Sequence, residues 1–166
     1  MKIGVLSDTH LRHPNPALDI ILAEMFKDVD MILHAGDIVS AKVLQYLELH
    51  RVIAVCGNMD DYEVAGMAPQ ERIISAGDKK IGLVHGWGSR EGLENRIITR
   101  FHEKPDIIVY GHSHVPFWGS VDGVRMFNPG SASQNRSGAK PTVGILEIAS
   151  GEFFAHILDA PNPKNR

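Results

Sequence analysis

Apolar runs and helix-like stretches alternate along the first third of the chain. Residues 2–6, 31–34 and 51–56 are short apolar runs and predict strands. Residues 17–27 place apolar side chains at helical spacing, and Ser40 is positioned to cap a second helix that runs to about Leu49. This order predicts βαβ units and a largely parallel sheet.

The pattern of apolar and polar residues changes after residue 70, where short apolar runs joined by turn residues predict hairpins. We expect hairpin strands at 72–76 and 80–84, at 117–121 and 124–127, and at 142–148 and 152–158. A helix is predicted at 89–101 and a buried strand at 106–110. The predicted fold is α/β: a four-layer α-β-β-α sandwich of two mixed sheets flanked by helices. One domain is expected over 1–160, followed by a polar C-terminal tail at 161–166.

Composition narrows the class of protein. A chain of 166 residues with 43% hydrophobic content suits one compact domain. The formal net charge of −3 predicts no broad basic surface, so stable nucleic-acid binding is not expected. The single cysteine, Cys56, lies after an apolar run and is expected to be a buried, reduced thiol. Without a signal-peptide or membrane-spanning pattern, we expect a cytoplasmic protein that does not bind membranes.

Five short blocks of polar residues each follow an apolar run. They are Asp8-Thr9-His10, Gly36-Asp37, Gly57-Asn58, His85-Gly86 and Gly111-His112-Ser113-His114. Taken singly, an aspartate here could cap a helix, His85 could be a packed core histidine, and Gly57-Asn58 could be a simple turn. Together they predict one crevice, because parallel strands bring their carboxyl ends to the same edge of a sheet.

The side chains in these blocks suit a transition metal. Carboxylate, imidazole and amide oxygen ligands favour Mn, Fe, Zn, Ni or Co over Ca. There are enough ligands for two ions if one carboxylate bridges them. Two ions about 3.5 to 4 Å apart can share a hydroxide and neutralise a phosphoryl group during in-line displacement. The pattern therefore indicates phosphoester hydrolysis.

The blocks DTH, GD, GN, H and GHSH, in this order, resemble the calcineurin-like metallophosphoesterase superfamily over essentially the whole chain. The small size and the segment Asn128-Pro129-Gly130-Ser131 make the chain most similar to the compact bacterial and archaeal phosphodiesterases of the YfcE type. The resemblance implies the metallo-dependent phosphatase fold and two divalent ions per chain, with manganese expected first. It implies that Asp37 bridges two ligand sets: Asp8, His10, Asp37 and His114, and Asp37, Asn58, His85 and His112.

The sequence departs from this superfamily at Met59, where many members carry a histidine that contacts phosphate. A thioether cannot protonate a leaving group, so we expect better activity on activated aryl phosphodiesters than on phosphomonoesters. Asp60 could act as a substitute acid or contact a metal-bound water; alternatively, it could only stabilise the turn. The residues expected to act in catalysis are Asp37, Asp60 and His112.

Other candidates carry weaker expectations. His34 is expected to be a packed histidine rather than a ligand. Trp87 and Trp118 could form an apolar wall for a nucleoside or aryl group, but core packing is favoured. Arg12 and Arg136 could contact substrate phosphate or could be surface charges. The 128–131 segment is expected to be a tight turn that supports the ligand loops.

Alternatives to a phosphodiesterase remain. A protein-interaction scaffold of the same fold, similar to the retromer subunit, is one, and a phosphomonoesterase of the same superfamily is another. A nuclease is disfavoured, because such relatives usually carry additional nucleic-acid-binding regions. The expected partner is a small-molecule phosphoester, and the resemblance also allows a homodimer or homotetramer.

Overall fold

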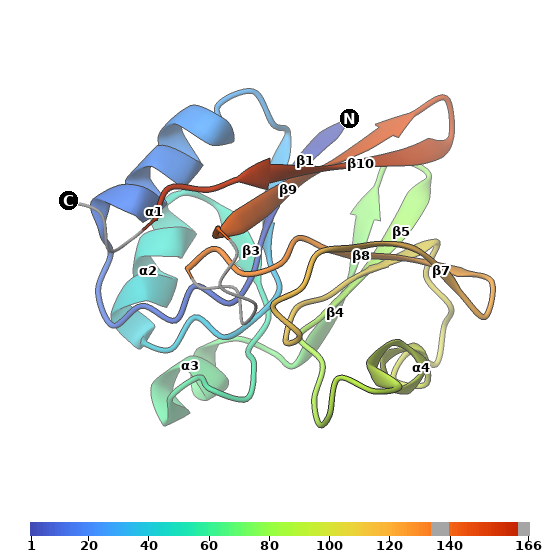
Figure 1. Cartoon of the computed structure of the whole chain (residues 1–166), viewed down its shortest axis with the longest axis horizontal. Helices are drawn as coiled ribbons and strands as arrows, with labels where there is room; N and C mark the ends of the chain where they lie inside the picture. The colour runs from blue at the N-terminus through green and yellow to red at the C-terminus, as the bar shows by residue number, and fades with distance from the viewer. Residues whose placement is uncertain (134–139, 163–166) are drawn as a thin grey trace.

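Two five-stranded sheets form the centre of the molecule in the computed structural model, which describes residues 1–133 and 140–162 (Figure 1). In the first sheet β1, β2 and β3 run parallel, and β9 and β10 are added antiparallel at the side of β1. The strand order is β10 (Glu152–Asp159), β9 (Thr142–Ala149), β1 (Lys2–Leu6), β2 (Met31–His34) and β3 (Val52–Ala54).

The second sheet is also mixed. Strands β5, β6 and β8 are parallel, and hairpin partners β4 and β7 close its two edges antiparallel. The strand order is β4 (Glu71–Ala76), β5 (Lys79–Val84), β6 (Ile107–Val109), β8 (Val124–Asn128) and β7 (Phe117–Val121). The three predicted hairpins are therefore confirmed.

Three apolar clusters hold the layers together. The central cluster joins the facing sides of the sheets, with Val5 and Leu33 from the first and Leu83 and Val109 from the second. The outer face of the first sheet is covered by the helical segment α1 (Pro16–Ile20) with η1 (Ile21–Met25), and by α2 (Ala41–Leu49). Helix α4 (Leu93–Ile98) packs on the second sheet. The predicted four-layer sandwich of two mixed sheets flanked by helices is confirmed.

Several predicted boundaries need correction. The helix predicted at 89–101 spans only Leu93–Ile98, because Gly92 adopts a left-handed conformation and Arg96 donates to the carbonyls of Trp87, Ser89 and Glu91. These bonds hold the preceding residues as a loop. The helix predicted at 17–27 begins at Pro16 and widens into a π-helical turn.

The strands predicted at 51–56 and 106–110 shorten to Val52–Ala54 and Ile107–Val109. Helix α3 (Tyr62–Met67), whose first turn is capped by the Asp61 side chain, was not predicted. Residues 163–166 of the predicted tail lie outside the described part of the chain. No described helix is both long and apolar enough to span a membrane.

Candidate metal centre

The five polar blocks meet where the two sheets adjoin. Asp8 and Asp37 follow β1 and β2 of the first sheet, whereas His85 and His112 follow β5 and β6 of the second. Backbone hydrogen bonds tie the loops together: Asp8 N donates to Gly36 O at 3.0 Å, and Gly111 N donates to His85 O at 3.1 Å. The amide of His112 donates to Oδ2 of Asp8 at 3.1 Å, which links the two sheets at the centre.

One compact ligand cluster consists of Asp8, His10, Asp37 and His114. One ligand atom from each lies within 4.8 Å of the others, among the described residues. Nε2 of His114 is 3.0 Å from Oδ1 of Asp8, and Nε2 of His10 is 3.7 Å from Oδ2 of Asp37. The two Nε2 atoms are 3.1 Å apart. These are the residues that the resemblance assigns to one metal.

The residues assigned to a second metal lie beside this cluster in a more open arrangement. Nε2 of His85 is 3.2 Å from Oδ2 of Asp37. Nδ1 of His112 is 2.8 Å from Oδ1 of Asn58, and the rings of His85 and His112 are 5.3 Å apart. Oδ2 of Asp37 therefore faces both sets, as a bridging ligand must.

Two buried ligand atoms without a hydrogen bond indicate that Asp8 and His85 fit a cation. Asp8 Oδ1 and His85 Nε2 are buried and make no hydrogen bond within the described residues, and other ligand groups lie close to them: His114 Nε2 at 3.0 Å from Asp8 Oδ1, and Asp37 Oδ2 at 3.2 Å from His85 Nε2. The other atoms of both side chains are anchored: Ser7 donates to Asp8 Oδ2 at 2.6 Å, and His85 Nδ1 bonds the Ala35 carbonyl at 2.7 Å. Because Nδ1 must then carry the proton, the Nε2 lone pair of His85 is directed into the centre, as in metal-binding histidines.

The electrostatics favour ionised carboxylates. Burial acts to raise the pKa of Asp8, but the imidazoles of His10, His114 and His85 around it hold that pKa well below its usual range. Burial is likewise outweighed at Asp37, where His85 and the Met59 amide lower the pKa. Two ionised carboxylates in a buried pocket need positive charge nearby, and bound cations would supply it.

The ligand loops use backbone conformations that L-residues seldom adopt. Five of the ligand residues have φ between 47° and 69°, in the left-handed region: Asp8, His10, Asp37, His112 and His114. Space is also tight. A Cβ on Gly57 would lie 2.2 Å from Oδ1 of Asp37, and one on Gly111 would lie 1.9 Å from Oγ of Ser7. The glycines before Asn58 and His112 thus allow the loops to approach each other.

Asp60 and Met59 lie at the edge of the candidate metal centre, next to Asn58. Both carboxylate oxygens of Asp60 accept backbone hydrogen bonds, Oδ1 from Val39 N and Oδ2 from Gly57 N at 2.6 Å. This is the geometry of the turn-stabilising role, one of those that the sequence left open. Burial raises the pKa of Asp60, against the effect of these two bonds. The Met59 side chain is 58% exposed, while its amide donates to Oδ1 of Asp37 at 2.8 Å.

Buried polar residues support the loops from behind. His34 is fully buried and is no part of the ligand cluster; Nδ1 accepts from Gly36 N at 3.2 Å and Nε2 pairs with Oγ1 of Thr9 at 3.1 Å. The Asn128 amide donates to the Gly111 carbonyl at 2.8 Å, and Oγ of Ser131 donates to the Asp8 carbonyl at 2.9 Å. His34 is packed and the 128–131 segment supports the ligand loops, as predicted.

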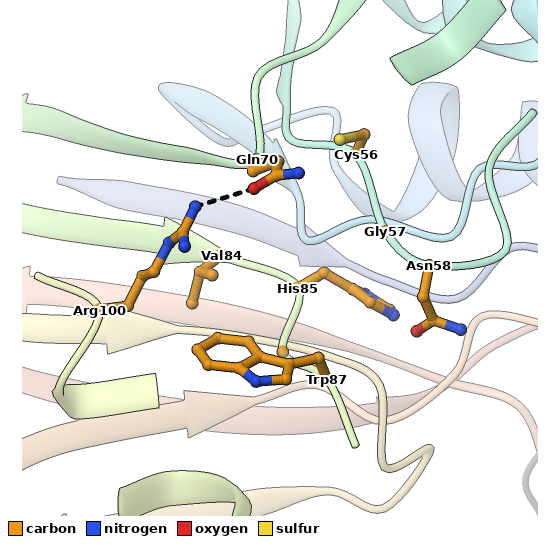
Figure 2. A pocket seen from close by; sticks show the side chains of 9 residues that line it. Cys56, Gly57, Asn58, Gln70, Val84, His85, Trp87 and Arg100 are labelled. Carbon is orange, nitrogen blue, oxygen red and sulfur yellow. Dashed lines mark hydrogen bonds between the residues drawn. The ribbon is translucent and has the colours of Figure 1, made fainter. Parts of the chain in front are cut away.

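The expectation that both tryptophans pack in the core is wrong. Trp87 is 39% exposed and Trp118 is 36% exposed. Trp118 lies on β7 under the Arg125 guanidinium, whereas Trp87 follows His85 and lines a cavity that reaches the metal centre (Figure 2). This placement matches the alternative of a wall for an aryl or nucleoside group.

Some lining residues were missed or cannot be placed. Gln70 and Arg100 line the same cavity, but no motif singled them out, because Gln70 lies just before β4 and Arg100 just after α4, both away from the strand-end blocks. Arg12 lines a separate hollow together with Met59. Arg136 lies outside the described residues.

Comparisons with known proteins agree with this geometry. A family model described as the calcineurin-like phosphoesterase superfamily domain matches residues 1–151. A probable metallophosphoesterase of Methanocaldococcus jannaschii is 34% identical over 153 residues, covering 90% of this chain and 76% of the relative. A phosphodiesterase of the same organism is 31% identical over 174 residues, covering 96% of this chain and all (100%) of the relative.

Solved structures share the fold. An archaeal phosphodiesterase structure superposes with a TM-score of 0.72 at 28% identity, covering 95% of this chain and 100% of that one. A Vps29 variant from Entamoeba histolytica gives a TM-score of 0.68 at 24% identity, covering 96% of this chain and 99% of that one. The second likeness concerns the fold alone.

Proposed function

Because the chain belongs to the calcineurin-like phosphoesterase superfamily, we propose that it is a phosphodiesterase that acts with two divalent transition-metal ions, manganese being the expected one. The observation that carries the proposal is the largely buried cluster of Asp8, His10, Asp37 and His114, in which Asp8 Oδ1 makes no hydrogen bond and lies 3.0 Å from His114 Nε2. A buried carboxylate oxygen without a hydrogen bond, beside three further ligand groups, supports a metal site.

The proposed ligand sets share one residue. Asp8, His10, Asp37 and His114 would hold one ion, and Asp37, Asn58, His85 and His112 would hold the other. Bound there, the ions would supply an activated water for in-line attack on phosphorus and offset the charge of the phosphoryl group.

The chain's own groups prepare the centre. Oδ1 of Asp37 is fixed by the Met59 amide, which leaves Oδ2 to face both ligand sets. We propose Asp37 and His112 as the residues that contact the reacting group. For Asp60, the two backbone hydrogen bonds support the turn role rather than proton donation.

Substrate preference follows from the rim of the centre. With Met59 beside Asn58 there is no imidazole at this position to protonate a poor alkoxide leaving group, a contribution that is often about 10² to 10⁴-fold in rate. Activated aryl phosphodiesters do not need such help. We therefore propose phosphodiesters rather than phosphomonoesters as substrates.

The test compares hydrolysis of bis(p-nitrophenyl) phosphate and p-nitrophenyl phosphate by protein loaded with Mn, Ni, Zn or Co, alongside the metal content per chain. We expect faster turnover of the diester and a loss of about 100-fold or more in Asp37→Asn and His112→Ala. His156→Ala, an exposed histidine on β10, is the matched control. Equal or better turnover of the monoester would contradict the diesterase proposal.

A scaffold of the same fold is the alternative outcome. If protein with two ions per chain is inert toward a broad panel of phosphodiesters, the scaffold interpretation is favoured. We also propose a cytoplasmic location and a homodimeric or homotetrameric assembly, which fractionation and light scattering would test.

A further inference from the structure

A cavity of about 310 Å³ opens beside the metal centre. Asn58 and His85 form the side nearest the centre, and Gln70, Trp87 and Arg100 form the far side (Figure 2). A volume of this size lies at the lower end of small-molecule pockets. A substrate held at the centre could therefore place one of its groups here.

Trp87 offers a flat apolar surface on a firmly held loop. Its backbone carbonyl accepts from Nε of Arg96 at 3.3 Å and from Nη2 at 3.1 Å. Trp87 is nevertheless 39% exposed, with the Arg100 guanidinium over its ring at 6.0 Å from the centroid. An aromatic residue that is held at its backbone and partly exposed is suited to stacking against a second ring.

Gln70 is oriented by Arg100. Nη2 of Arg100 donates to Oε1 of Gln70 at 2.8 Å, and its Nε pairs with Glu71. Because the amide oxygen is engaged on that side, the amide nitrogen of Gln70 is turned away from Arg100 and toward Gly57 and Asn58 (Figure 2). The far side of the cavity therefore combines an aromatic face with a directed hydrogen-bond donor.

We propose that this cavity is a subsite for a planar heteroaromatic ring, such as a nucleobase, on one ester arm of the substrate. The ring stacks on Trp87, and one of its acceptor atoms receives a hydrogen bond from Nε2 of Gln70. Arg100 is a positioning residue that fixes the Gln70 amide. The inference rests on the proposed phosphodiesterase function and narrows its substrate class.

The test uses two probes that differ only in the base: adenosine 5′-monophosphate and ribose 5-phosphate. Inhibition constants are measured against bis(p-nitrophenyl) phosphate with the metal-loaded enzyme. Stacking of one base predicts that the adenosine compound binds about 5- to 150-fold more tightly. The ratio of the two inhibition constants should fall toward one in Trp87→Ala and persist in Trp87→Phe. It should fall in part in Gln70→Ala and stay unchanged in the control Trp118→Ala.

A second readout does not require activity. The chain has two tryptophans, so Trp118→Phe leaves Trp87 as its single indole. Adenosine 5′-monophosphate should quench this emission saturably, and ribose 5-phosphate should not. Equal inhibition constants for the two probes in the wild type, or an unchanged ratio in Trp87→Ala, would overturn the subsite.

The experiments can refute the phosphodiesterase function and the ring subsite independently of each other. If the metal-loaded protein does not hydrolyse the diester at all, the proposed function fails. The fluorescence titration of Trp118→Phe then still decides the subsite: saturable quenching by the adenosine compound alone supports it, and no difference between the two compounds refutes it.

Discussion

Replacing Gly57 by alanine tests whether the close approach of the loops sets the position of Asp37. The added Cβ would lie 2.2 Å from Oδ1 of Asp37, 2.5 Å from its backbone nitrogen and 2.8 Å from Cδ2 of His85. Ordinary contacts of this kind begin at 3.4 Å, so Asp37 and its loop must shift by about 1 Å. The φ of Gly57 lies outside the left-handed region, so the substitution tests space alone.

A displacement of about 1 Å at a catalytic group can cost about 100-fold in rate, and overpacking typically costs about 1–3 kcal/mol of stability. We expect Gly57→Ala to lose about 100-fold in metal-dependent hydrolysis of bis(p-nitrophenyl) phosphate and to bind fewer than two ions per chain.

Gly66→Ala is the matched control, because nothing lies within 4 Å of its Cβ in α3 and alanine favours a helix by roughly 0.5–1 kcal/mol. Thermal unfolding of both variants separates misplacement from unfolding. A Gly57→Ala protein with full metal content and a rate within threefold of wild type would refute the reasoning.

Three further results are expected. Removing the ions with a chelator should lower the melting temperature by roughly 5–10 °C, because a ligand at 100 times its Kd adds about 2.7 kcal/mol of stability. The chelator should lower the melting temperature of Asp37→Asn by less. Equal melting curves with and without metal would contradict the proposed metal site. Burial lowers the pKa of His34 from 6.5 to about 3, so the unfolded chain binds a proton that the folded chain does not. Stability should therefore fall by roughly 1 kcal/mol per pH unit as the pH drops from 6 to 4, with a shallower slope in His34→Gln by urea titration. Asp60→Asn should cost about 1–2 kcal/mol through loss of one backbone acceptor and leave the pH–rate profile unchanged; loss of its alkaline limb would instead assign proton donation to Asp60.

Elements with a clear hydrophobic period could be predicted from the sequence. Strands β1 and β2 are apolar apart from Lys2 and His34 at their ends, and the three hairpins carry strong turn residues such as Asp122-Gly123, whose left-handed φ angles of 48° and 74° match their type. Helix α3 was missed because only Val64 of its six residues is buried, so no apolar stripe marks it. The length of α4 depends on Arg96, whose side-chain hydrogen bonds to three loop carbonyls leave no mark in the hydrophobic pattern.

The residues of the candidate centre could be predicted from the sequence, but the backbone conformation of their loops could not. Position after a strand identified Asp8, Asp37 and His85, because strand ends converge whatever the details of the loops. The left-handed backbone at Asp8 and Asp37 has only a weak local signal, since neither is glycine and aspartate adopts this region more often than most residues but still seldom. The exposure of Trp87 depends on the loop before α4, which the sequence wrongly assigned to a helix.

The left-handed ligand residues also bear on how such a chain can evolve. At Asp8, His10 and Asp37, and at both histidines of the 111–114 block, the backbone itself prefers glycine, by roughly 1–2 kcal/mol per residue. Selection for the proposed metal binding would therefore have to retain these side chains although glycine at the same positions would make the fold more stable. A descendant released from catalysis would be expected to drift toward glycine or asparagine at these five places while its sheets stay intact.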